Sequence, residues 1–207
     1  MTVVLWTLIA YLIGAIPTSY LAARFIAGID LREQGSGNLG ATNLYRVLGL
    51  KYALPVGVFD VAKGTAAVVL CGRMAGDGAW LPYLTGAAAI VGHVFPVYLR
   101  FKGGKGVATA AGVMAGLAPI PIAVSAAFWG LLLYATGIMS LASVAGAIAF
   151  PLAVWVFAPG RPLLLVTGIL IASFIIFTHR ANIQRLLRGT EPRVGRRARV
   201  DERQQGA

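Results

Sequence analysis

Long apolar runs, separated by short polar segments rich in glycine, proline and basic residues, make up most of the chain. Residues 3–23 and 162–178 carry no charge and approach or reach the length at which a helix crosses a bilayer. Pro17 predicts a kink in the first run, because proline interrupts helical hydrogen bonding. The pattern predicts an all-α polytopic membrane protein. The apolar runs lie at residues 3–23, about 53–71, about 80–99, 107–136, 139–158 and 162–178.

The composition supports this prediction. Of the 207 residues, 58% are hydrophobic and 12% are charged, which is too apolar for a soluble domain. Because little room is left for a separate soluble domain, we expect one membrane domain over residues 1–191. A basic, loosely ordered cytoplasmic tail is expected over residues 192–207. The single cysteine, Cys71, excludes a disulfide within the chain.

The net charge of +11 is concentrated in three segments, residues 24–51, 100–105 and 180–203. Lysine and arginine mark the cytoplasmic side of membrane proteins, where anionic headgroups attract them. The charge therefore indicates a lipid surface as the partner, not nucleic acid.

The span count follows from placing these three segments on one side of the membrane. With the N-terminus outside, three spans reach residues 100–105. The tail then returns to the cytoplasm only if residues 107–136 cross twice, turning at Pro119 and Pro121. We therefore expect seven spans, two of them short at roughly 14–16 residues against the usual ~17–25. A five-span arrangement, with residues 139–178 as one bent crossing, is the alternative.

Two familiar nucleotide-binding patterns are incomplete. Residues 35–40 match G-x-G-x-x-G, but the polar residues 30–34 precede them where a buried strand is required. Gly106 stands where a phosphate-binding loop would carry the serine or threonine that binds magnesium. Carboxylates are few and the two histidines are far apart, so we expect neither a metal nor another cofactor.

The segment 92–109 joins two apolar runs through a basic, glycine-rich loop. Glycines allow backbone N–H groups to approach a bound group closely, and lysines add positive charge. This chemistry suits a phosphate held beside a membrane, whereas the alternative is an ordinary basic cytoplasmic loop. The candidate residues of this segment are His93, Lys102, Gly103, Gly104 and Lys105.

Other polar residues gather near the ends of the apolar runs. His179 and Asn182 are three apart, so a continuing helix would place both on one face. The alternative for them is an ordinary polar helix end. The segment 35–49 contributes residues that are either ligands or turn formers. These are Ser36, Asn38, Thr42, Asn43 and Arg46.

Two further pairs lie within the apolar runs. Asp60 and Lys63 are three apart on one helical face, and charges at such depth are commonly functional or mutually paired. We expect a paired, supporting role near the site. Ser140 and Ser143 open a later run. Serines there most often bond a helical carbonyl, and both are also candidate substrate-binding residues.

Together these segments resemble the acyl-phosphate-dependent glycerol-3-phosphate acyltransferases, the PlsY family of bacterial membranes. Three motifs carry the resemblance, and DVAKG at 60–64 and SLAS at 140–143 add to it. The motifs are GSGNLGATNLYRVLG at 35–49, GHVFPVYLRFKGGKGVAT at 92–109 and HRANIQRLLRGTE at 179–191.

The resemblance implies an activity, a location and a set of residues. A fatty acyl group would pass from acyl phosphate to the 1-hydroxyl of sn-glycerol 3-phosphate, giving lysophosphatidic acid and phosphate. The enzyme would lie in the bacterial inner membrane with its active site facing the cytoplasm. The essential residues would be Ser36, Arg46, Gly103, Gly104, Lys105, His179 and Asn182, with Glu191 in a structural role.

The chemistry of these residues leaves some roles open. Two phosphate anions require cations such as Arg46 and Lys105. Lys105, Asn182 or loop N–H groups could stabilise a tetrahedral oxyanion. The base is either His179 or a substrate phosphate, and we interpret Ser36 as a phosphate ligand and not a nucleophile. A small-anion transporter is the competing hypothesis, and a scaffold is a weaker one.

Overall fold

The computed structural model describes residues 1–195, and all regular elements among them are helical. Part of the expected tail, residues 196–207, lies outside the described residues. The helices form two compact units, Met1–Pro119 and Ile120–Ala207. A single membrane domain over residues 1–191 stays a prediction.

Five helical stretches of the described chain are long and apolar enough to cross a membrane. A sixth is formed if two helices joined by a 64° bend make one span. This confirms an all-helical polytopic architecture, while the number of crossings and the side of each terminus stay predictions. The five stretches are Thr2–Ala27, Leu50–Ala75, Leu81–Leu99, Pro119–Thr136 and Met139–Phe157, and the bent pair is Pro162–Thr178 with Arg180–Leu187.

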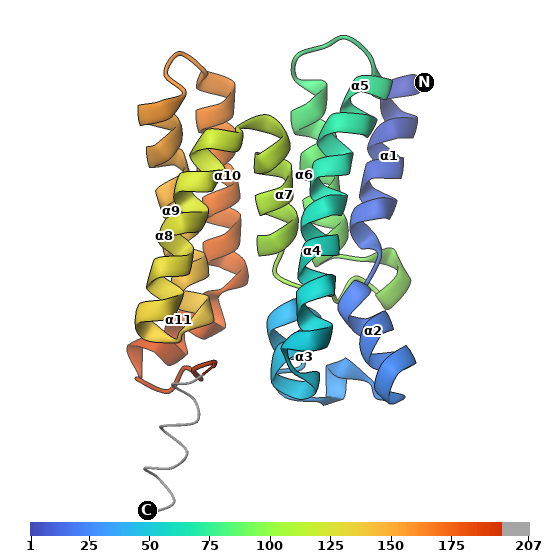
Figure 1. Cartoon of the computed structure of the whole chain (residues 1–207). Helices are drawn as coiled ribbons and strands as arrows, with labels where there is room; N and C mark the ends of the chain where they lie inside the picture. Colours follow the sequence, from blue (N-terminus) through green and yellow to red (C-terminus); the bar gives the residue numbers. More distant parts are fainter. Residues whose placement is uncertain (196–207) are drawn as a thin grey trace, which may run out of the picture. The chain divides into compact units, whose positions relative to one another are not determined.

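Unit 1 is built around two closely packed helix pairs, α1 with α6 and α4 with α7 (Figure 1). Gly14 lies against the backbone of Ala89, and Gly112 lies against that of Val61, so a side chain at either glycine would clash. Small residues of this kind let membrane helices approach closely. The elements of unit 1 are α1 (Thr2–Ala15), α2 (Thr18–Ala27), η1 (Leu31–Glu33), α3 (Ala41–Leu48), α4 (Leu50–Ala66), η2 (Ala67–Cys71), α5 (Gly72–Ala75), α6 (Leu81–Val94), η3 (Val97–Leu99) and α7 (Val107–Leu117).

The first apolar run breaks where Pro17 predicts a kink. Helix α1 ends at Ala15 and α2 begins at Thr18. Proline lacks an N–H group, so the helical ladder cannot continue through it. Figure 1 shows α2 and α3 at the end of unit 1 away from the N-terminus.

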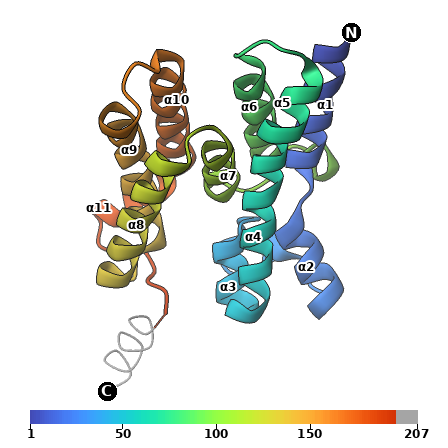
Figure 2. The same cartoon turned by 45° about the horizontal axis from the view of Figure 1, so that its top comes forward.

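Unit 2 packs α9 (Met139–Phe157) against α10 (Pro162–Thr178). Gly146 of α9 approaches Trp129 of α8 (Pro119–Thr136), where an added Cβ would lie 3.2 Å from the Trp129 Cβ. The short α11 (Arg180–Leu187) follows α10 after the 64° bend at His179 (Figure 2). Helix α11 contacts both α9 and α10.

The run 107–136 divides at Pro119, as predicted, but unevenly. Helix α7 has 11 residues and α8 has 18, whereas two helices of similar length were expected. The residue before a proline avoids helical geometry, so the break falls at Ala118. Pro121 lies in the first turn of α8, where the missing N–H has no intrahelical partner to lose, and it causes no second break.

Candidate active site

Asn43 organises the loop that carries Ser36. Its Oδ1 atom accepts the Ser36 N–H at 2.8 Å, and its Nδ2 donates to the Gln34 carbonyl at 2.9 Å. The residue is 1% exposed, and a weaker Nδ2 contact reaches the Leu31 carbonyl at 3.4 Å. These bonds differ from the expectation that Asn43 binds a substrate, because they use the amide to fix the Ser36 backbone.

Gly35 completes this arrangement. Its φ of +58° is the left-handed conformation that glycine adopts readily, and a Cβ there would overlap the Asn43 Oδ1 atom. Ser36 itself is exposed. The loop therefore presents its hydroxyl-bearing residue on a fixed backbone.

Arg32 and Asp30 brace the loop before Ser36. The Arg32 Nη2 atom lies 2.6 Å from Asp30 Oδ2, and the guanidinium lies 5.3 Å from the centre of the Tyr20 ring. Hydrogen bonds from the Arg32 side chain and backbone lower the pKa of Asp30 to about 2. Asp30 therefore stays ionised at physiological pH and caps η1.

Helix α3 brings two other predicted residues onto one face. Thr42 and Arg46 are four residues apart in α3, and both are half-buried. Asn38 is also half-buried and precedes the helix. The planar guanidinium of Arg46 is suited to bind a phosphate through two hydrogen bonds.

The glycines of the basic loop close the end of α6. The Gly103 N–H donates to the Val94 carbonyl at 3.1 Å, and the Gly104 N–H donates to the His93 carbonyl at 3.2 Å. A Cβ on Gly103 would overlap the His93 carbonyl, and one on Gly104 would overlap His93 Nε2. Both N–H groups are engaged with α6, which differs from the expectation that they face a bound phosphate.

Lys105 follows these glycines directly and is half-buried, whereas Lys102 is exposed. Gly106 then caps α7 with a φ of +83°. The helix N-terminus and the Lys105 ammonium together give this corner of unit 1 a positive character.

Asp60 and Lys63 form the ion pair that their spacing predicted, with Lys63 Nζ 2.7 Å from Asp60 Oδ1. The Nδ1 atom of His93 lies 3.7 Å from the same oxygen. All three side chains are buried. They therefore support the site from within unit 1 without being open to a substrate.

His179 ends α10 in unit 2 and is buried. Its Nδ1 atom lies 2.8 Å from the Ile175 carbonyl oxygen. Because a carbonyl only accepts, Nδ1 carries the proton. In the neutral imidazole Nε2 is then the basic nitrogen.

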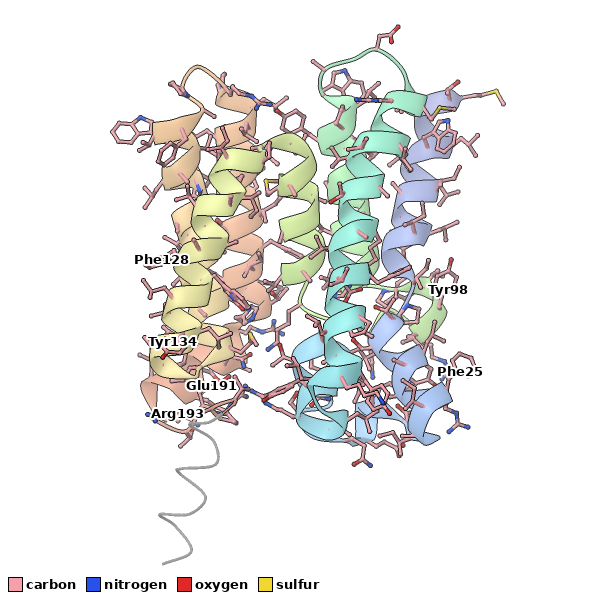
Figure 3. The ribbon with its side chains drawn as sticks, in the orientation of Figure 1. Phe25, Tyr98, Phe128, Tyr134, Glu191 and Arg193 are labelled. Atoms are coloured by element: carbon pink, nitrogen blue, oxygen red, sulfur yellow. The ribbon has the colours of Figure 1, made fainter. Side chains whose placement is uncertain are left out.

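The Glu191 carboxylate accepts hydrogen bonds from three polar side chains of unit 2. Its Oε1 atom accepts from Ser140 Oγ at 2.7 Å and from Asn182 Nδ2 at 2.6 Å, while its Oε2 accepts from Arg185 Nε at 2.7 Å. Figure 3 shows Glu191 near the end of α11. This cluster fixes the Asn182 amide and engages the Ser140 hydroxyl, which was expected to bind a substrate.

Burial alone would raise the pKa of Glu191, but the hydrogen bonds from Asn182, Ser140 and Arg185 hold it below its ordinary value. Arg185 was not among the residues expected at the site. Its position three residues after Asn182 on α11 was the available indication.

Ser143 also has protein partners. Its Oγ donates to the Met139 carbonyl at 2.8 Å, as the sequence suggested for serines in spans, and accepts from Trp129 Nε1 at 3.4 Å. The contact with Trp129 links α8 to α9. The hydroxyl therefore serves packing within unit 2.

Comparisons with known proteins agree with this picture. Residues 4–189 match the family model described as glycerol-3-phosphate acyltransferase. The chain is 46% identical over 190 residues to the glycerol-3-phosphate acyltransferase of Gloeobacter violaceus, covering 90% of this chain and 92% of that protein. It is 47% identical over 185 residues to that of Desulforudis audaxviator, covering 89% and 92%.

Solved structures give the same result. One is a crystal structure of PlsY, an integral membrane glycerol 3-phosphate acyltransferase, in its glycerol 3-phosphate form. It superimposes on this chain with a TM-score of 0.86 at 39% sequence identity, and the match covers 94% of this chain and 96% of that one. Its lysophosphatidic acid form gives a TM-score of 0.84 at 38% identity. The chain therefore belongs to the glycerol-3-phosphate acyltransferase family of integral membrane enzymes.

Proposed function

We propose that the acyl donor is acyl phosphate and that the acceptor is the 1-hydroxyl of sn-glycerol 3-phosphate. The products are lysophosphatidic acid and inorganic phosphate. The observation that carries this proposal is the similarity, over 94% of the chain, to a PlsY solved in glycerol 3-phosphate and lysophosphatidic acid forms. The active site faces the cytoplasm of a bacterial inner membrane, in accord with the basic segments 24–51 and 100–105.

Arg46 and Lys105 hold the two phosphate groups. The Coulomb attraction between a unit cation and an anion about 4 Å apart is about 4 kcal/mol at an effective dielectric constant near 20, without the cost of desolvation. Two such cations offset much of the repulsion between the substrates. Ser36, on the backbone held by Asn43, donates its hydroxyl to a phosphate, and Asn38, Thr42 and Lys102 are outer contacts.

Asn182 stabilises the tetrahedral oxyanion that forms when the glycerol hydroxyl attacks the acyl carbonyl. Glu191 accepts one hydrogen bond from the Asn182 amide, which fixes the direction of the amide group. Lys105 and the loop N–H groups of unit 1 are the alternative donors for this role. Losing one oxyanion donor typically costs about 10²–10³ in kcat.

Two groups fit the role of general base, namely Nε2 of His179 and the phosphate of a substrate. Nδ1 of His179 is bonded to the Ile175 carbonyl, which orients the ring for either catalysis or binding. A His179→Gln variant distinguishes the two. A fall in kcat of about 10²–10⁴ assigns the base to His179. A change confined to KM assigns it to the substrate.

Turnover by the purified protein tests the proposal. Incubated with acyl phosphate and glycerol 3-phosphate, the protein is expected to release phosphate and form lysophosphatidic acid. An acyl thioester supplied in place of acyl phosphate serves as the donor control. Uptake of glycerol 3-phosphate into sealed vesicles without chemical change would instead indicate a transporter and would end the proposal.

A further inference from the structure

The carboxylate of Asp60, on α4, meets groups from two other helices of unit 1. Its Oδ1 atom accepts from Thr18 Oγ1 of α2 at 2.7 Å and pairs with Lys63 Nζ of α4 at 2.7 Å. The Nδ1 atom of His93, on α6, lies 3.7 Å from the same oxygen. One buried oxygen therefore lies where α2, α4 and α6 meet, with a hydrogen bond to α2 and a longer contact to α6.

Stability alone does not explain this cluster. Asp60 is 1% exposed and Lys63 is 3% exposed, and both lie within an apolar helix. Replacing a buried ion pair by well-packed apolar residues is often neutral or stabilising, because removing the charges from water is costly. Ionisable residues inside a membrane segment therefore indicate a function.

The first connection leads to the loop of Ser36. Thr18 is the first residue of α2, directly after the break at Pro17. Lys63 Nζ also donates to the Ile16 carbonyl at 3.1 Å, so the ion pair holds both sides of the break. Helix α2 then packs through Ala23 into the apolar cluster that holds the following loop. The other buried members of that cluster are Leu31, Leu39, Leu44, Ala53 and Val56.

The second connection leads to Lys105. The His93 ring, on the side away from Asp60, contacts Gly104 so closely that a Cβ there would overlap Nε2. The His93 carbonyl also accepts the Gly104 N–H. Gly104 immediately precedes Lys105, so the position of this imidazole sets the position of the lysine backbone.

We propose that Asp60 is a positioning residue, which fixes the Ser36 loop and the Gly104–Lys105 segment relative to each other through Thr18 and His93. It acts through these two residues and does not touch a substrate. A displacement of about 1 Å in a reacting group can lower the rate about 10²-fold. The contact between Thr18 and Asp60 therefore affects turnover more than it affects folding.

Thr18→Val tests this directly, because it removes the hydroxyl donated to Asp60 and leaves the ion pair intact. The matched control is Thr7→Val in α1, whose hydroxyl bonds only the Val3 carbonyl of its own helix at 2.8 Å. We expect Thr18→Val to lower kcat/KM for acyl transfer at least about tenfold relative to Thr7→Val, with similar thermal unfolding midpoints. Equal activities of the two variants would overturn the proposal.

A charge exchange provides the second test. In the double variant Asp60→Lys, Lys63→Asp the pair is kept, but the carboxylate no longer lies where Thr18 and His93 meet it. Relative to Asp60→Asn, we expect the exchange to restore thermal stability only in part, because the bond from Lys63 to the Ile16 carbonyl is lost, and not to restore kcat/KM. Recovery of both thermal stability and kcat/KM would show that the pair is purely structural and would overturn the proposal. If the exchange variant does not fold, the comparison of Thr18→Val with Thr7→Val decides.

The inference rests on the acyltransferase activity, so the wild-type protein is assayed first. If the wild type turns over and kcat/KM is lower for Thr18→Val than for Thr7→Val, the positioning role is supported. If the wild type turns over and the two variants have equal kcat/KM, that role alone is rejected. No wild-type turnover would reject the proposed function itself.

Discussion

Asn43 and Glu191 act alike, because each is a buried side chain that directs its hydrogen bonds to neighbouring protein groups. Asn43 fixes the backbone of Ser36, and Glu191 fixes the amide of Asn182. The role of Asn43 cannot be recognised from sequence alone, since asparagine near glycines is equally suited to contact a ligand, whereas the family resemblance already implied a structural role for Glu191. The candidate residues could be named from the sequence, whereas the division of these candidates between exposed groups and positioning residues required the fold.

Glu191→Gln is expected to destabilise the protein by about 1–3 kcal/mol, because it removes the negative charge that pairs with the Arg185 guanidinium. The folded pKa lies below the ordinary value of 4.5, so this stabilisation is fully present above that value and is lost as the pH falls through the folded pKa. The difference between wild type and variant in thermal unfolding should therefore shrink in acid. Glu33→Gln, at an exposed position, is the control, and a difference independent of pH would contradict the assignment.

At the scale of elements, glycines and prolines decide where helices end and how closely they pack. Pro17 and Pro119 mark breaks that were predictable, because proline acts locally. The unequal lengths of α7 and α8 were not predictable from apolar pattern alone, since Pro121 is tolerated within a first turn. The role of Gly103 and Gly104 in closing α6 also depends on a contact with His93 that only the fold reveals.

Gly104→Ala is expected to lower both stability and activity, because its Cβ would overlap the His93 ring. Overpacking of this kind costs about 1–3 kcal/mol, and the displaced Lys105 should reduce kcat/KM further. Thermal unfolding in detergent and acyl-transfer kinetics measure the two effects. Gly130→Ala in α8, where no atom beyond the local backbone lies within 4 Å of the new Cβ, should leave both near wild type. Equal behaviour of the two variants would contradict the proposed packing role.

At the scale of the whole molecule, apolar length and the distribution of basic residues predicted an all-helical membrane protein. The described chain has five helical stretches of spanning length, a bent sixth and the 11-residue α7. Five or six stretches of the described chain are therefore long and apolar enough to cross, and α7 is shorter, so the expected seven crossings stay a prediction. The positive-inside rule predicts that the loop of residues 28–40 lies inside and that the turn near Asp77 lies outside.

Single-cysteine labelling tests that topology. In a Cys71→Ala background, Gln34→Cys should be protected from a membrane-impermeant thiol reagent added to intact cells, whereas Asp77→Cys should react. Both native residues are exposed, so protection reports the membrane side and not burial. The opposite labelling pattern would contradict the predicted orientation.

We propose that transfer of an acyl group from acyl phosphate to glycerol 3-phosphate by this chain depends on Lys105 of unit 1 and on Asn182 of unit 2. The most direct measurement counts lysophosphatidic acid and phosphate formed by purified wild type, Lys105→Met, Asn182→Ala and the exposed-lysine control Lys51→Met. We predict equal amounts of the two products, a fall of about 10²–10³ in kcat for the first two variants and near wild-type turnover for Lys51→Met. Phosphate release without lysophosphatidic acid, or full activity of Lys105→Met and Asn182→Ala, would contradict the account.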